Sequence, residues 1–210
     1  MTISIIGAGN VGLALAGNLI GKGDSVFFGV PEPAKYAAAV AALGRNAQIG
    51  TVAQAVAASD LVILAVPYGA ARQVAESIAD WSGRILVDAT NPLAPALAGL
   101  ALGTTTSGAE QVAGCAHGAR VVKAFNTTGA ENMADPRYPG GAVFMPVAGD
   151  DADARGRVVA LATRLGFDAV DVGPLAAARY LEPFAMIWIH MAIKRGMGRD
   201  FAFIRQQRRG

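Results

Sequence analysis

The sequence predicts a doubly wound α/β fold, in which a mostly parallel sheet carries helices on both faces and a helical segment follows at the C-terminal end. Three observations favour this fold. A glycine-rich loop at residues 7–12 follows a short β-branched stretch and precedes a helical pattern. Strand-like and Ala-rich helical stretches then alternate along most of the chain. Residues 61–66 are continuously apolar, which is typical of a central parallel strand that is buried on both faces.

The glycine-rich loop Gly7-Ala8-Gly9-Asn10-Val11-Gly12 follows the strand at 2–6 and has the G-x-G-x-x-G spacing. In such a loop Gly7 allows a tight turn, Gly9 leaves room for a pyrophosphate, and Gly12 lets the helix pack close to the strand. Free N–H groups at the start of the helix, together with the helix dipole, form an anion site. The alternative is a glycine-rich turn that binds nothing. The helix that follows in phase favours dinucleotide binding.

The other elements follow from hydrophobic periodicity and from turn and cap residues. Further strands are predicted at residues 24–29, 47–50, 61–67, 84–87, 120–125, 142–148 and 167–172. Further helices are predicted at residues 31–43, 51–58, 70–79, 107–115 and 153–165. Thr51 and Ser107 are expected to be N-caps. Residues 95–106 are expected to form a loop, and Pro146 puts its strand at or near an edge of the sheet.

The chain is predicted to form one dinucleotide-binding domain, residues 1–173, with a helical segment, residues 174–210, packed on it. In that segment Phe184, Ile187, Trp188 and Met191 have the spacing of one apolar helix face, which predicts a core or subunit contact. His190 lies off this stripe and is expected to be structural or exposed.

Composition excludes several classes of protein. Hydrophobic residues make up 53% of the chain and charged residues 16%, which favours a compact fold over disorder. The longest apolar run, residues 184–193, is well short of the ~20 residues of a membrane span. The start is not typical of a signal peptide. The single cysteine, Cys115, suits a reducing cytoplasm, and two histidines and one cysteine give no metal-ligand spacing. We therefore expect a cytoplasmic protein with no metal site and no membrane partner.

Charge is distributed unevenly. The net charge is +2, but from Lys194 onward six basic residues stand against one acid. A basic segment of this kind suits an anionic ligand, a nucleic acid or simply a solvated surface. The solvated surface is favoured and no nucleic-acid partner is expected, because aromatic residues are not interleaved with the basic ones.

The end of the second strand concerns the adenosine ribose. An NAD site usually has an acid there to hold the 2′-hydroxyl group. Here the strand ends Gly29-Val30-Pro31, and Pro31 directs Glu32 outward. The missing acid favours NADP over NAD, and Lys35 is placed to reach a 2′-phosphate. Alternatively, Lys35 is an ordinary solvated helix residue.

Polar side chains follow two of the later strands. Asn91-Pro92 and Asn126-Thr127-Thr128 stand where a nicotinamide or its ribose would lie. These residues could equally be turns that satisfy their own backbone. The loop that starts at Pro67 should lie at the same sheet edge. Lys123 is expected either at an edge or in a cleft.

No catalytic triad, nucleophile elbow or carboxylate pair is found, so no catalytic side chain is assigned. A nucleotide fold of this kind suits hydride transfer between two cofactors, where the protein mainly orients the rings.

Several motifs together resemble the F420-dependent NADP oxidoreductase family, which is related to pyrroline-5-carboxylate reductase and to the nucleotide domain of membrane ferric reductases. They are G-A-G-N-V-G at 7–12, V-I-L-A-V-P at 62–67, D-A-T-N-P-L at 88–93, K-A-F-N-T-T-G at 123–129, V-A-G-D-D at 147–151 and D-V-G-P-L at 171–175. The resemblance implies a Rossmann-fold homodimer that binds NADP(H) and a deazaflavin. It also implies an acceptor pocket walled by the Asn91-Pro92 loop and the C-terminal helix.

The family usually has Ser-Arg where this chain has Val30-Pro31, so of the residues that hold the 2′-phosphate only Lys35 is kept. Losing one charge-assisted contact should cost about 1.5–3 kcal/mol, or roughly 10- to 100-fold in affinity. NADP remains the predicted cofactor, with NAD possible, and F420 or a flavin is the predicted second substrate and small-molecule redox carrier. The predicted cofactor-binding residues are Gly7, Ala8, Gly9, Asn10, Val11, Gly12, Val30, Lys35, Val66, Pro67, Ala70, Asn91, Pro92, Asn126 and Thr127. Reduction of a small imine or carbonyl compound and non-catalytic NADP(H) sensing stay open as alternatives.

Overall fold

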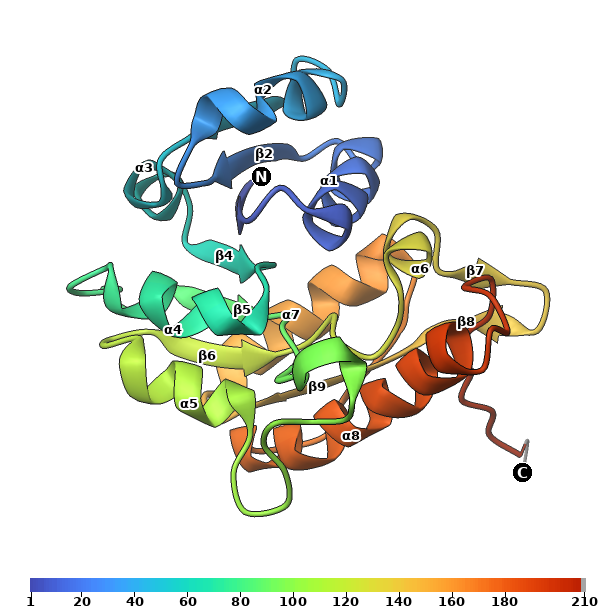
Figure 1. Cartoon of the computed structure of the whole chain (residues 1–210). Coiled ribbons are helices and arrows are strands. Elements are labelled where there is room, and N and C mark those ends of the chain that lie inside the picture. The colour runs from blue at the N-terminus through green and yellow to red at the C-terminus, as the bar shows by residue number, and fades with distance from the viewer. Residues whose placement is uncertain (209–210) are drawn as a thin grey trace.

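The computed structural model describes residues 1–208 and shows an eight-stranded sheet with helices on both faces (Figure 1). The strand order is β10-β9-β6-β5-β4-β1-β2-β3. The strands are β1 (Thr2–Ile6), β2 (Ser25–Gly29), β3 (Ala47–Gly50), β4 (Leu61–Leu64), β5 (Ile85–Asp88), β6 (Arg120–Lys123), β9 (Phe144–Gly149) and β10 (Asp168–Asp171). Strands β7 (Arg137–Tyr138) and β8 (Gly141–Ala142) form a separate antiparallel hairpin. The predicted fold class is confirmed.

The six strands β1 to β6 are parallel, so their carboxyl ends share one edge of the sheet. Strand β1 lies between β2 and β4, and Ile5 is paired with Phe28 on one side and Ile63 on the other. The order of the strands reverses at this point, where doubly wound folds bind their ligands. Strand β9 runs antiparallel to β6, and β10 runs parallel to β9. Pro146 therefore lies one strand in from the edge, as predicted.

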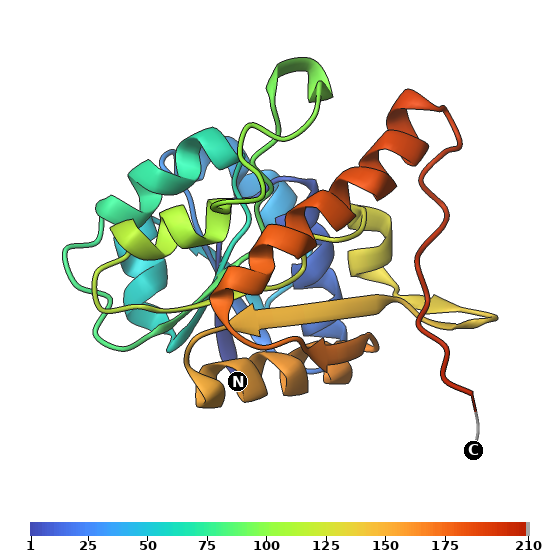
Figure 2. The same cartoon turned by 90° about the horizontal axis from the view of Figure 1, so that it is seen from below.

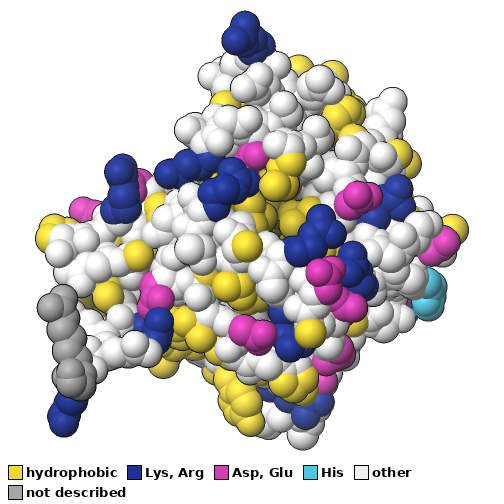
Figure 3. All heavy atoms as spheres, turned by 180° about the vertical axis from the view of Figure 1, so that it is seen from behind, with side chains coloured by type: hydrophobic (Ala, Val, Ile, Leu, Met, Phe, Trp, Pro, Cys, Tyr) yellow, Lys and Arg dark blue, Asp and Glu magenta, His cyan; other side chains and the backbone are white. Residues whose placement is uncertain are grey.

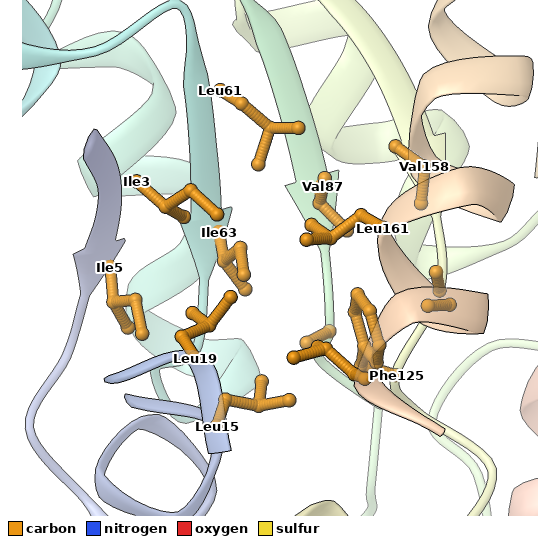
Figure 4. Close-up of a cluster of buried hydrophobic side chains, with 14 of the residues drawn as sticks. Ile3, Ile5, Leu15, Leu19, Leu61, Ile63, Val87, Phe125, Val158 and Leu161 are labelled. Atoms are coloured by element: carbon orange, nitrogen blue, oxygen red, sulfur yellow. The ribbon is translucent and has the colours of Figure 1, made fainter. Parts of the chain in front are cut away.

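Two apolar clusters, one on each face, hold the helices against the sheet. The first face carries α1 (Asn10–Gly21), α2 (Pro33–Ala41) and α7 (Ala152–Leu165), with the short α6 (Ala130–Ala134) beside α1. The second carries α3 (Val52–Ala58), α4 (Tyr68–Glu76), α5 (Gly108–Cys115) and α8 (Ala178–Ile189). Figure 4 shows part of the first cluster, where Leu15 and Leu19 of α1 meet Ile3, Ile5 and Ile63 of the sheet. Both faces are buried because alternate side chains of each central strand point to opposite clusters.

Local capping residues mark several helix starts. The Thr51 side chain accepts a hydrogen bond from the Gln54 N–H, and the Gln54 side chain accepts one from the Thr51 N–H, which forms a capping box. The Ser107 side chain accepts from the Glu110 N–H in the same way. Both predicted N-caps are confirmed. One short 3₁₀ turn, Pro95–Leu97, lies within the predicted loop at 95–106.

Helix α8 crosses one side of β9 while α7 covers the other (Figure 2). The apolar stripe predicted for this segment is buried only in part: Trp188 is buried, whereas Phe184 and Met191 are half-buried. The Ile187 side chain is 52% exposed, whereas Leu181, Ala185 and Trp188 are buried. The helix continues as a π-helical turn, His190–Lys194, in which His190 is exposed. No helix in residues 1–208 is long and apolar enough to cross a membrane.

The chain after α8 runs back along the molecule as an extended strap, residues 199–205 (Figure 2). The indole N–H of Trp188 donates to the Phe201 carbonyl at 2.9 Å, and the Trp188 and Phe201 rings stack. The Phe144 N–H donates to the Phe203 carbonyl at 2.9 Å. The strap therefore fixes the end of α8 against β9.

Candidate functional site

The glycine loop between β1 and α1 is shaped by close approach of backbone. Gly7 has a φ of +106°, and a Cβ there would collide with the Ala65 carbonyl oxygen. A Cβ on Gly12 would collide with the Gly7 carbonyl oxygen. At Gly9, by contrast, a Cβ would meet no atom within 4 Å. Gly7 and Gly12 are thus required by the packing of the protein itself, while Gly9 faces open space.

The N-terminus of α1 presents backbone donors to that space. The first bond within the helix runs from the Leu13 N–H to the Gly9 carbonyl at 2.9 Å. The N–H groups of Asn10, Val11 and Gly12 come before this first helical donor and therefore have no acceptor within the helix. Together with the helix dipole they form an anion site.

A cleft of about 410 Å³ opens from this point along the carboxyl edge of the sheet. Its floor comes from the ends of β4, β5 and β6, and its far wall comes from α8 and the segments next to it. The lining residues are Gly9, Asn10, Val11, Ala65, Val66, Pro67, Ala89, Asn91, Leu93, Leu97, Asn126, Thr128, Gly129, Ala130, Ala185, Trp188, Ile189, Ile193 and Arg199. Among these described lining residues Arg199 is the single member of the Lys, Arg, His, Asp and Glu types. The cleft is lined mainly by small residues, amides and apolar side chains.

Two asparagines tie the ends of β5 and β6 together in the floor. The Asn91 side-chain amide donates to the Asn126 carbonyl at 2.8 Å, and the Asn126 amide donates to Asn91 Oδ1 at 3.0 Å. The Asn126 amide also lies 3.3 Å from the Leu181 carbonyl of α8. The side-chain NH₂ group of Asn126 thus donates to two acceptors, while its side-chain oxygen, Oδ1, accepts no hydrogen bond from the described residues. That buried oxygen has no hydrogen-bond partner among residues 1–208.

Phe125, just before Asn126, has a left-handed backbone with a φ of +57°. Such a conformation costs about 1–3 kcal/mol for a residue with a side chain and persists only where the surroundings impose it. The Phe125 ring is buried and packs edge-on against Phe167, with 5.8 Å between ring centres. This packing holds the turn that brings Asn126 opposite Asn91.

A buried ionic cluster lies close to the floor. The Lys123 ammonium is 3.0 Å from Asp88 Oδ2 and 3.2 Å from Glu182 Oε1, and it also donates to the Thr90 carbonyl. The Glu182 carboxylate accepts from the Gly108 and Ala109 N–H groups at the start of α5. Lys123 and Asp88 are wholly buried, and Glu182 is 2% exposed. The cluster fastens α8 to the sheet and to α5. Of the two alternatives for Lys123, an edge or a cleft, neither holds: it is the centre of this cluster.

Tyr68, at the start of α4, lines a smaller cavity of about 320 Å³ that shares Val66, Pro67 and Asn91 with the cleft. Burial raises the pKa of the Tyr68 phenol, and the nearby Glu182 and Asp88 carboxylates raise that pKa further. The phenol is therefore protonated at neutral pH.

The predicted site residues fall into two groups. Gly9, Asn10, Val11, Val66, Pro67, Asn91 and Asn126 line the cleft. The others lie outside its lining: Gly7, Ala8 and Gly12 shape the loop, Val30, Pro92 and Thr127 are buried, Ala70 is half-buried on α4, and Lys35 is exposed on α2. Lys35 Nζ lies 5.5 Å from the centre of the Tyr36 ring.

Sequence reasoning missed the individual residues of the far wall, above all Ala185, Trp188, Ile189, Ile193 and Arg199. The predicted stripe contained Trp188 but assigned it to a core or subunit contact. A signal was available in the basic residues after Lys194, one of which is Arg199. Residues 1–208 contain no group of three or more His, Cys, Asp or Glu side chains placed to hold a metal ion.

Comparison with protein families matches residues 2–92 to a family described as NADP oxidoreductase, coenzyme F420-dependent. A crystal structure from Arthrobacter sp. FB24, described as a candidate F420-dependent NADP reductase, is 30% identical with a TM-score of 0.85. The match covers 98% of this chain and 99% of that one. A hypothetical protein from Sinorhizobium meliloti is 35% identical with a TM-score of 0.79, over 88% of this chain and 90% of that one.

Two further proteins share less. The rat metalloreductase STEAP3 is 33% identical over 184 residues, which are 86% of this chain but 35% of that protein. The chain thus matches about a third of the length of this curated relative. A reductive aminase from Aspergillus terreus, solved with NADPH and ethyl levulinate, is 20% identical with a TM-score of 0.68, over 93% of this chain and 62% of that one. That likeness is one of fold.

Proposed function

The chain belongs to the coenzyme F420-dependent NADP oxidoreductase family, and from this premise we propose that it transfers hydride between NADP(H) and a deazaflavin or flavin carrier. Membership of the family makes it an NADP-dependent oxidoreductase. The observation that carries the finer proposal is the cleft itself. One cleft of about 410 Å³ is lined both by the start of α1, with its anion site, and by apolar side chains of α8.

The residues at the first end of the cleft fit the pyrophosphate of a dinucleotide. Because Gly9 has no side chain, the space beside it is open to a pyrophosphate. The N–H groups of Asn10, Val11 and Gly12 can donate hydrogen bonds to a ligand in that space. Lys35 supports the choice of NADP, because it is an exposed cation on the helix that follows β2.

The floor of the cleft fits the nicotinamide end. Bound there, reduced nicotinamide supplies a hydride, and the protein has to hold its ring. The unpaired Oδ1 of Asn126 suits a carboxamide N–H, because a buried acceptor without a partner costs about 1–3 kcal/mol until a donor arrives. The Asn91 pair holds the Asn126 amide in place.

The far wall fits a flat carrier. Trp188, Ile189 and Ile193 line the cleft together with Leu93 and Leu97, which gives apolar surface against which a ring system can lie. These side chains exclude water from the meeting point of the two rings. Orientation at short distance is then the main contribution of the protein to the rate.

The test is a panel of oxidised carriers, F420, FMN, riboflavin and a ferric chelate, each mixed with NADPH or NADH and followed by loss of nicotinamide absorbance. We expect turnover with a deazaflavin or flavin and intersecting double-reciprocal lines, because both ligands are bound together. Parallel lines would contradict simultaneous binding. Binding of NADPH without turnover of any carrier would indicate a sensor instead.

A second candidate, reduction of a small imine or carbonyl compound, is favoured by Tyr68. Its protonated phenol lines the cavity that adjoins the cleft and is placed to donate a proton. Tyr68→Phe would then lower imine or carbonyl turnover roughly a hundredfold with NADPH affinity unchanged. In the carrier mechanism the same variant should retain most of its turnover.

We also propose that the protein forms a homodimer through the outer face of α8. Tyr180 and Ile187 are 77% and 52% exposed there, which is unusual for large apolar side chains on one helix face. Light scattering on a sizing column should give twice the 21.4 kDa of one chain, and Ile187→Glu should give monomers. A monomeric parent protein would contradict the proposal.

A further inference from the structure

One cationic side chain, that of Arg199, lines the cleft on the α8 side, and it has no role in the hydride transfer proposed above. Arg199 follows the π-helical turn and lies in the lining with Gly129, Ala130 and Trp188. Its side chain is 46% exposed, so the guanidinium keeps access to solvent and to a ligand. An arginine in this position offers a rigid, permanently charged fork of N–H donors.

The position of Arg199 is fixed by the strap that follows it. Two residues later, the Phe201 carbonyl accepts from the Trp188 indole N–H at 2.9 Å and from the Asn132 amide at 2.8 Å. The Trp188 and Phe201 rings stack with 5.4 Å between their centres. On the other side, the Met197 N–H donates to the Met191 carbonyl at 3.2 Å, so the backbone is held before and after Arg199.

The ion pair that Arg199 forms within the protein is weak. A single contact of 3.2 Å joins its Nη1 to Glu131 Oε1, and the Glu131 side chain is 47% exposed. Surface pairs of this kind contribute little net stability. A phosphate group carries more charge than a carboxylate and matches the arginine fork in two-point hydrogen bonding. Exchange of Glu131 for a ligand phosphate is therefore favourable.

We infer that Arg199 binds a phosphate group of a ligand in the cleft and that Glu131 holds the guanidinium until the phosphate displaces it. The carrier is the expected source of this phosphate, because the N–H groups of α1 already serve the dinucleotide and Arg199 lies on the α8 wall. The choice of carrier rests on the proposed function.

The experiment compares FMN with riboflavin, which differ by one phosphate, through quenching of flavin fluorescence in protein saturated with NADP⁺. In Arg199→Gln the dissociation constant for FMN should rise about tenfold, and that for riboflavin should not change. Glu131→Gln should instead lower the dissociation constant for FMN about threefold. Arg195→Gln is the control, because it removes an equal charge from the same segment outside the cleft lining.

The opposite signs separate binding from support of the fold. If Arg199→Gln and Glu131→Gln change FMN binding in the same direction, or if FMN and riboflavin weaken alike, the ion pair is structural and the inference is wrong. Calorimetry with NADP⁺ is the second arm. A loss in Arg199→Gln confined to NADP⁺ would support the phosphate site and assign it to the dinucleotide, whereas unchanged affinity for every ligand would overturn it. None of these measurements needs turnover, so failure of the hydride-transfer proposal would be seen separately in the carrier panel.

Discussion

The two walls of the cleft are built in different ways. The glycine-loop wall consists of backbone and small side chains that are neighbours in the sequence, and its shape follows from where a Cβ does not fit. The α8 wall consists of large apolar side chains that are held by contacts between distant parts of the chain. Glu182 of α8, for example, accepts from the Gly108 N–H, which is 74 residues away in the sequence. The first wall is therefore encoded mainly by one short segment, although Gly7 also lies against the Ala65 carbonyl, whereas the second depends on many contacts between distant segments.

The two walls also differ in charge. The glycine-loop wall attracts anions through N–H groups and a helix dipole, neither of which can be changed by a single side-chain substitution. The α8 wall is fastened by buried charges and carries one partly exposed cation, Arg199, whose partner is Glu131. Acidic and basic side chains lie next to one another on much of the face seen from behind (Figure 3).

The largest expected effect is on the fastening of the α8 wall. Lys123→Met leaves the Asp88 and Glu182 carboxylates buried without their cation, which should lower the free energy of unfolding by about 3–5 kcal/mol. Urea unfolding of the ligand-free protein measures it. Lys194→Met, an exposed lysine just after α8, is the control and should have little effect.

Neutralising the carboxylates as well tests the cause of that loss. In the triple variant Lys123→Met, Asp88→Asn, Glu182→Gln the uncompensated charges are gone, so much of the stability should return. A loss of under about 1 kcal/mol in Lys123→Met alone would show that the cluster does not fasten α8.

On the glycine-loop wall, Gly9→Val should give a folded protein whose affinity for NADPH is at least about a hundredfold lower, because the branched side chain occupies the pyrophosphate space. Calorimetry measures the affinity, and the melting temperature reports the fold. Gly17→Val places the same side chain on the exposed face of α1 and should bind normally. Equal affinity in Gly9→Val would mean that the loop is only a turn.

Two substitutions near the adenosine end of the same wall test the preference for NADPH over NADH. Pro31→Arg restores the arginine that the family usually has there and should tighten NADPH binding about tenfold while NADH hardly changes. Lys35→Ala should weaken NADPH selectively. If Lys35→Ala changes both cofactors alike, or neither, Lys35 is a solvated residue and does not select NADP.

The smallest effect concerns the carrier side. Ile189→Ala removes apolar surface from the cleft wall and should raise the KM for the carrier about fivefold without changing the KM for NADPH. Ile187→Ala, two residues away on the same helix and outside the cleft lining, should leave both KM values unchanged. Equal effects of the two variants would remove the distinction between the inner and outer faces of α8.

Much of the fold could be predicted because its signals are local. Thr51 and Ser107 cap helices through hydrogen bonds to N–H groups three residues later in the chain. Pro146 restricts β9 to a position at or near the edge of the sheet. The α8 register could not be predicted, because apolar residues occur on both faces of that helix. Its orientation is set by Glu182, which bonds to Lys123, Gly108 and Ala109 from far away in the sequence. Lys123 was ambiguous for the same reason: its residue type says nothing about partners on other elements.

The three glycines of the loop are subject to different physical constraints. Replacement at Gly7 or Gly12 is opposed by the protein's own backbone, whereas Gly9 meets open space and is constrained only by what binds there. In a lineage that stopped binding dinucleotides, mutation at the first two positions would still be removed for loss of folding, while the third would be free to drift. A descendant that keeps residues equivalent to Gly7 and Gly12 but carries a bulky side chain in place of Gly9 is thus expected to keep the fold and to have lost dinucleotide binding.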